Sequence, residues 1–184
     1  SQPMKSAILL LIAFLNCMNS RCQVMTSDEQ ALFDLIMNYR KTKNLPSIPF
    51  SPSLTIVAQT HAKDLAENNP DQGRCNLHSW SGKGNWSPCC YTDDHAKAQC
   101  MWNKPSELTS YSGNGYEISA WSSEDITAEE ALSMWKSSPG HHACVINSGI
   151  WKQSWQAMGV GIYNGYALVW FGNEVDPLSQ SRKK

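Results

Sequence analysis

The chain has 184 residues, with 15 lysines and arginines against 16 aspartates and glutamates, so its formal net charge is −1. The basic residues are scattered apart from a cluster at residues 182–184, which argues against a nucleic-acid-binding protein, because such proteins need a basic face. After removal of a leader, about 160 residues would remain, which suits one domain with a sizeable core.

The amino-terminal segment has the form of a secretory signal. Met4 and Lys5 precede an apolar run over residues 7–15, which is too short to span a bilayer. We interpret residues 1–22 as an upstream remnant and a signal peptide cleaved near residues 20–22. No later run is apolar enough to cross a membrane, so we expect a secreted, extracellular protein with a single domain over residues 23–176 and a polar tail over residues 177–184.

Five cysteines lie in the body of the chain, and secretion favours disulfides over zinc thiolates for all five. They are Cys75, Cys89, Cys90, Cys100 and Cys144. The adjacent Cys89 and Cys90 point in different directions, so we expect them to pair with different partners. Cleavage before Cys22 would add a sixth cysteine and permit three bridges, whereas cleavage after it leaves one thiol over. The sequence leaves the connectivity open.

Two amphipathic helices are predicted at the start of the domain. Ser27 and Gln30 have the spacing of a capping box, and apolar residues follow at helical intervals. Residues 41–49 form a proline-punctuated loop, after which a second helix begins at Ser51. His61 lies on the apolar face of this helix. We interpret it as a core histidine, because a lone histidine at helical spacing usually belongs to packing.

Residues 74–116 show little periodicity and are rich in cysteine, tryptophan, glycine and proline. This composition predicts a long cross-linked loop, and a loop of such length in a compact domain is usually functional. Asn85, Trp86 and Ser87 form a glycosylation sequon that the following Pro88 weakens. The chain has eight tryptophans, of which we expect most to build the core and others to line a groove.

The last third of the chain predicts a strand, a helix and a hairpin. Residues 115–121 alternate as a strand does, and a helix capped by Thr127 must stop at Pro139 and Gly140. We therefore expect His141 on a tight turn that points into a cleft. Residues 157–163 and 166–171 flank Asn164-Gly165, which is the strongest short hairpin signal. The elements together predict an α+β domain in which helices cover an antiparallel sheet.

Four motifs in this order resemble the CAP superfamily of cysteine-rich secretory proteins, antigen 5 allergens and pathogenesis-related proteins. They are His78-Ser79 after a cysteine, Gly115-Tyr116-Glu117, Trp135 ahead of His141, and residues 158–161 before a final aromatic strand. The resemblance covers residues 27–175. It implies a three-layer α-β-α sandwich with a central antiparallel sheet and a central cleft.

The resemblance also implies which residues line the cleft, where members of the family place two histidines and two acids and some bind zinc. His78 and His141 would be the histidines and Glu117 one acid, while Ser138 stands in place of the second acid. Two imidazoles and a carboxylate would suit a zinc ion or another divalent metal with an open position. The same set could hold an ordered water instead, and His142 could compete with His141.

We therefore expect a non-catalytic extracellular binding protein that acts on a lipid such as a sterol, or on a protein partner. The resemblance suggests the lipid, and the tryptophan-rich loop supplies the aromatic area that binding sites favour. A divalent metal held by His78, Glu117 and His141 is the cofactor that the cleft could take. The alternative is a metal-dependent hydrolase or protease that uses Glu117 as base or ligand.

Overall fold

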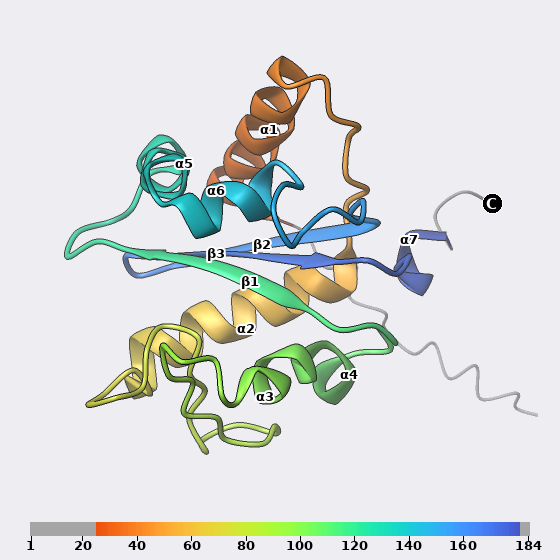
Figure 1. The fold of residues 1–184 in the computed structure, drawn as a ribbon. Coiled ribbons are helices and arrows are strands. Elements are labelled where there is room, and N and C mark those ends of the chain that lie inside the picture. The colour runs from red at the N-terminus through yellow and green to blue at the C-terminus, as the bar shows by residue number, and fades with distance from the viewer. Residues whose placement is uncertain (1–24, 181–184) are drawn as a thin grey trace, which may run out of the picture.

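The computed structural model describes residues 25–180, so the predicted signal peptide and its cleavage site lie outside the described residues. The architecture is the predicted α+β sandwich, with a sheet between two helical layers (Figure 1). One layer consists of α1 (Ser27–Thr42), α5 (Ala128–Ser137) and α6 (Pro139–Val145). The other consists of α2 (Pro52–Asn68), α3 (Ala98–Trp102) and α4 (Lys104–Leu108), and a short helix, α7 (Pro177–Gln180), follows the last strand.

The sheet has three antiparallel strands in the order β1-β3-β2. They are β1 (Tyr116–Trp121), β2 (Ala157–Tyr163) and β3 (Tyr166–Gly172). The hairpin between β2 and β3 turns at Asn164 and Gly165, as predicted, and both residues take a positive φ, of 43° and 81°. Such a two-residue turn matches the right-handed twist of the flanking strands.

The helix starts follow from hydrogen bonds to their first free amides. Thr26 caps α1 and forms a capping box with Glu29, so the box lies one residue earlier than the predicted Ser27 and Gln30. Ser51 caps α2 as predicted, and the proline that follows it suits the first helical position. Acidic side chains in the first turn of α1 and basic ones in its last turn complement the helix dipole.

The segment around His141 differs from the prediction. Helix α5 ends at Ser137 as expected, but Pro139 then opens a new helix, α6, instead of a tight turn. Proline has a fixed φ that suits the first turn of a helix, and Gly140 does not take a left-handed φ here. His141 is therefore held on the first turn of α6, which restrains its side chain more than a turn would.

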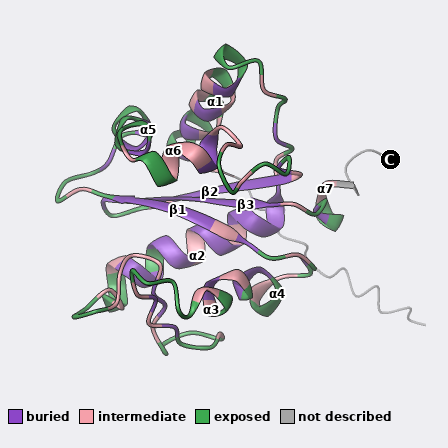
Figure 2. Cartoon of the chain, in the orientation of Figure 1, coloured by how far each residue is buried: buried purple, intermediate pink, exposed green. Residues whose placement is uncertain are grey.

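The sheet separates two hydrophobic cores, and its strands are almost wholly buried (Figure 2). Helix α2 packs directly on β2 through two glycines. A Cβ atom on Gly159 would come within 2.2 Å of the backbone of Leu54, and one on Gly161 within 2.3 Å of the backbone of Ala58. At these two positions no side chain fits between the strand and the helix.

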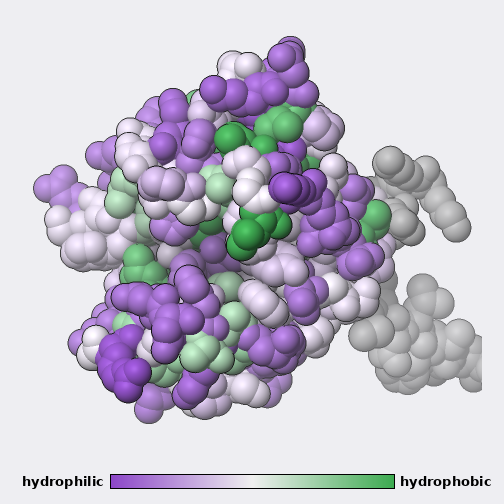
Figure 3. All heavy atoms as spheres, viewed as in Figure 1, coloured by the Kyte–Doolittle hydropathy of each residue, from purple (hydrophilic) through white to green (hydrophobic). Residues whose placement is uncertain are grey.

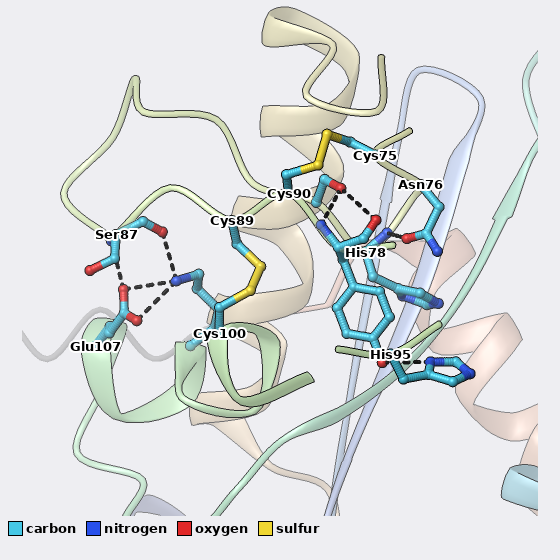
Figure 4. Close-up of a disulfide and its surroundings, with 12 residues drawn as sticks. Cys75, Asn76, His78, Ser87, Cys89, Cys90, His95, Cys100 and Glu107 are labelled. Atoms are coloured by element: carbon cyan, nitrogen blue, oxygen red, sulfur yellow. Dashed lines mark hydrogen bonds and ion pairs between the residues drawn. A yellow bond between two sulfur atoms is a disulfide. The ribbon is translucent and has the colours of Figure 1, made fainter. Parts of the chain in front are cut away.

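The predicted long loop contains α3 and α4 and is cross-linked by two disulfides, Cys75–Cys90 and Cys89–Cys100 (Figure 4). The adjacent cysteines do pair with different partners. The prediction that Cys144 forms a disulfide is wrong for the described part of the chain, where Cys144 is a buried free thiol. The reason is its position, because Cys144 packs in the core on the α1 side of the sheet whereas Cys89 and Cys100 pack on the α2 side.

Candidate functional site

A cavity of about 440 Å³ lies among β1, the loop that carries His78, α3, α6 and the segment after α6. The three predicted cleft residues, His78, Glu117 and His141, all line it. The rest of its wall is mainly apolar and aromatic. These side chains are Tyr91, Ala98, Met101, Trp102, Tyr116, Ile118, Cys144, Ile150 and Trp151, with His95, Ser138 and Gly140 completing the lining.

Glu117 forms the polar floor of this cavity. It lies on β1 opposite Trp170 of β3, and its side chain has no exposure to solvent. One carboxylate oxygen, Oε2, lies 2.5 Å from Nδ1 of His61, and the other, Oε1, lies 2.7 Å from Nδ1 of His78. Both oxygens of the carboxylate are thus engaged by imidazoles from two different segments of the chain.

His61 is the site residue that sequence reasoning missed. It is fully buried on α2, as a core histidine should be, and its ring stacks on Trp80 with centroids 4.1 Å apart. Its Nε2 lies 2.8 Å from the carbonyl oxygen of Ser79. Buried polar atoms need hydrogen-bond partners. Placing His61 in the core therefore implies a partner for each ring nitrogen, and an acidic residue is a suitable one.

The hydrogen-bond partners of His61 fix its protonation. The carbonyl oxygen of Ser79 can only accept, so Nε2 of His61 must donate. Burial opposes ionisation of Glu117, but the charge and hydrogen bonds of His61, followed by those of His78, outweigh it and hold the pKa of Glu117 below its ordinary value. With Glu117 ionised, His61 donates from both nitrogens and His78 donates from Nδ1.

His78 turns its second nitrogen to the cavity. Its backbone amide donates to Oδ1 of Asn76 at 3.0 Å, next to the Cys75–Cys90 disulfide (Figure 4). Its ring packs edge-on against Tyr91, and its side chain is 17% exposed. Among the described residues Nε2 of His78 has no hydrogen-bond partner. In the neutral ring, whose single proton Nδ1 donates to Glu117, Nε2 presents a lone pair.

His141 faces the same cavity from α6. Within residues 25–180 its ring nitrogens make no hydrogen bond. Burial, and then the neighbouring His78, lower the pKa of His141, so the ring is neutral at neutral pH. His142 does not compete for this place, because its Nε2 lies 2.8 Å from the hydroxyl of Tyr39 on α1, outside the cavity lining.

The donor geometry does not fit the predicted three-ligand metal site. A zinc site of the catalytic type needs three protein ligands with free lone pairs around an open position. Glu117 directs both oxygens to imidazole nitrogens, and Ser138 offers a hydroxyl where the family pattern has an acid. In the described part of the chain, no group of three or more histidine, cysteine, aspartate or glutamate side chains is arranged to hold a metal ion. Glu117 instead orients His78, as a carboxylate behind a histidine does.

Two sequence predictions concern the surface. Asn85 is exposed, as a glycan acceptor must be, and its glycosylation stays a prediction. No helix among residues 25–180 is long and apolar enough to cross a bilayer.

Comparisons with known proteins agree with this architecture. The profile of CAP, the cysteine-rich secretory protein family, matches residues 33–171. No curated protein matches the chain significantly.

Three solved structures share the fold. An extracellular protein containing an SCP domain from Bacillus anthracis is 22% identical with a TM-score of 0.55, over 80% of this chain and 40% of that one. An outer surface protein from Borrelia burgdorferi is 19% identical with a TM-score of 0.55, and the match covers 82% of this chain and 96% of that one. A cysteine-rich secretory protein from Staphylococcus aureus is 14% identical with a TM-score of 0.53, and the match covers 80% of this chain and 38% of that one. This chain thus spans about 40% of the length of the first and third.

Proposed function

Because this chain belongs to the cysteine-rich secretory protein (CAP) family, we propose that it is an extracellular binding protein whose central cavity takes a small apolar molecule. The similar proteins described as extracellular, secretory or outer-surface support the location. A lipid such as a sterol or a fatty-chain compound has the chemistry that the cavity wall would accept.

The observation that carries this proposal is the composition of the cavity. A volume of about 440 Å³ lies within the range of small-molecule sites, and the wall is largely aromatic and aliphatic. Two imidazole edges, from His78 and His141, are among the polar groups that face it without hydrogen-bond partners in residues 25–180. An apolar wall with a few convergent polar groups is the usual pattern of a site that binds an amphipathic ligand.

The rim of the cavity adds to this support. Ile150 lines the cavity and is 86% exposed, and Figure 3 shows apolar atoms gathered near the centre of this face, over the segment after α6. The segment is fixed by hydrogen bonds from the Asn147 side-chain amide to the carbonyls of Trp151 and Gln153, at 3.0 and 2.7 Å. Arg40 in turn donates to Oδ1 of Asn147 at 2.8 Å. The exposed isoleucine is therefore held in a defined place beside the opening.

Binding of Nile red, a neutral apolar dye, tests the proposal. We expect saturable binding with one site per chain, a change in the fluorescence of Trp102 or Trp151, and displacement by sterols or fatty-chain compounds. Ala98 lines the cavity from α3, so Ala98→Phe should fill part of it and weaken dye binding. Ala96 is exposed and outside the lining, which makes Ala96→Phe the matched control.

Equal dye binding by the two variants would contradict the proposal, because the dye would then bind elsewhere. The alternative of a metal-dependent hydrolase or protease has less support. Its proposed base or ligand, Glu117, already contacts two imidazoles through both of its oxygens.

A further inference from the structure

We propose that the molecule bound in the cavity carries a neutral hydroxyl group, which donates a hydrogen bond to Nε2 of His78. This inference rests on the proposed function and names the head group that the same site selects. It follows from the donor and acceptor roles in the hydrogen bonds beneath the cavity. It also follows from the absence of lysine and arginine from the cavity lining in the described part of the chain.

The donor and acceptor roles can be assigned from a backbone carbonyl, which can only accept. Ser79 accepts from Nε2 of His61 at 2.8 Å, and Nδ1 of His61 donates to Glu117 at 2.5 Å. The second oxygen of Glu117 accepts from Nδ1 of His78 at 2.7 Å. Because a neutral imidazole has one N–H, Nε2 of His78 is left as an acceptor that a ligand must meet with a donor.

A hydroxyl also suits the second imidazole. His141 has no hydrogen-bond partner among the described residues, so either tautomer is open to it. Its N–H can donate to the oxygen of a hydroxyl group whose hydrogen points to His78. An alcohol is both donor and acceptor, and it can therefore satisfy both imidazoles with one atom.

A carboxylate head group is poorly matched to this cavity. No lysine or arginine lines the cavity in the described part of the chain, so a bound carboxylate would lack a counter-ion. It also offers no donor to Nε2 of His78. Burying an unpaired charge is costly, so a fatty acid should bind more weakly than the alcohol of equal length.

An ammonium head group is disfavoured for a related reason. It could donate to His78, but it would need a free carboxylate to offset the loss of its water. Both oxygens of Glu117 are already bonded to imidazoles, so neither is free to pair with the ammonium. An alkylamine should therefore also bind more weakly than the alcohol.

The apolar body of the ligand has its own place in the wall. Met101 and Trp102 of α3, Ile118 of β1 and Trp151 after α6 all line the cavity. Trp151 packs edge-on against Tyr116 with ring centroids 5.0 Å apart, which gives a firm aromatic surface. The wall therefore offers apolar side chains beside a few polar groups, as an alcohol with a hydrocarbon body requires.

A series of matched ligands on the unmodified protein tests the head group. Decan-1-ol, 1-methoxydecane, decanoate and decylamine would each compete with bound Nile red at pH 7.5. The methyl ether keeps the oxygen and the apolar body but lacks the donor. We expect the alcohol to displace the dye at concentrations about fivefold to tenfold lower than the ether, as one net hydrogen bond implies, and lower than either charged analogue.

A variant of the protein provides the second readout. His78→Phe keeps an aromatic ring beside Tyr91 but removes the acceptor, so the preference for alcohol over ether should disappear while the ether still binds. His142→Phe is the matched control, because His142 lies outside the cavity lining, and it should keep the preference. If His78→Phe fails to fold, the ligand series on the unmodified protein decides alone.

The outcomes separate this inference from the proposed function. Dye displacement by all four ligands with alcohol and ether equal, or with decanoate or decylamine strongest, would overturn the hydroxyl assignment and leave the apolar site intact. No displacement by any of them would overturn both. A preference for the alcohol that depends on His78 supports both.

Discussion

Nδ1 of His61 lies 2.5 Å from Oε2 of Glu117 at a depth where neither side chain is exposed to solvent. The contact joins α2 to β1, so the same pair holds the helix to the sheet and sets the orientation of His78. Stability and ligand selection therefore depend on one buried carboxylate, and changes at Glu117 separate its two roles.

Replacing Glu117 by leucine should destabilise the protein by about 3–5 kcal/mol, because His61 and His78 would lose their acceptor inside the core. Glu117→Gln should cost clearly less. With Nε2 of His61 still donating to Ser79, its Nδ1 can accept from the amide NH₂, and the amide oxygen can accept from His78. Urea unfolding of both variants measures this, and equal losses would refute the hydrogen-bond assignment.

Acid should remove part of the stability that Glu117 contributes. Its pKa is lower in the folded protein than the ordinary value of 4.5, so the contribution is complete above about pH 4.5 and is lost as the pH falls through the folded value. The unfolding free energy of the parent should therefore fall as the pH drops from about 4.5 to 3. An unfolding free energy that stays constant over this range would show that Glu117 is not ionised in the fold.

Gly159→Ala should destabilise the protein by about 1–3 kcal/mol or more, because its Cβ would meet the backbone of Leu54 at 2.2 Å and neither can move aside cheaply. Gly140→Ala is the control. It lies in α6 with nothing within 4 Å of its added methyl group, so it should be neutral or slightly stabilising. Thermal unfolding compares the two, and similar melting temperatures would contradict the close packing of β2 on α2.

Ile150→Ser should weaken dye binding by about threefold to tenfold, since part of an isoleucine side chain would no longer cover the ligand. Stability should change by less than about 0.5 kcal/mol, because the side chain is already 86% exposed. Val175→Ser is the matched control, as Val175 is 46% exposed and outside the cavity lining. A loss of binding in both variants, or in neither, would argue against a role for the rim.

Cys144 should resist alkylation in the native protein and react only on unfolding. It is fully buried, and burial raises the pKa of its thiol, which leaves very little of the reactive thiolate. Peptide mapping without reduction should find Cys144 unlabelled in buffer and labelled in denaturant, with Cys75–Cys90 and Cys89–Cys100 intact. Rapid labelling in buffer, or a disulfide-linked Cys144 peptide, would contradict the structure.

Local sequence patterns predicted most of the fold. The Asn164-Gly165 turn, the caps at Ser51 and Thr127 and the end of α5 at Ser137 depend on neighbouring residues, so periodicity and capping signals predict them. The predicted tight turn at Pro139 was wrong. A proline can end one helix or begin the next, and local sequence does not distinguish the two; in the structure Pro139 begins α6.

The site could be predicted in part. His78, Glu117 and His141 do line one cavity, as the family resemblance implied. The use of Glu117 could not be predicted, because its partner His61 is 56 residues away and was assigned to packing. Similarly, the sequence does not distinguish Cys144 from the other cysteines, because it does not show that Cys144 packs in a different core from Cys89 and Cys100.

The contact between Gly159, Gly161 and the backbone of α2 has a consequence for evolutionary drift. At these two positions α2 meets the sheet with main chain against main chain, so the spacing there does not depend on side-chain volume. Apolar residues in the α1 layer can therefore change over many generations without shifting His61 relative to Glu117. We expect sequences that diverge widely in that layer to retain small residues at positions 159 and 161.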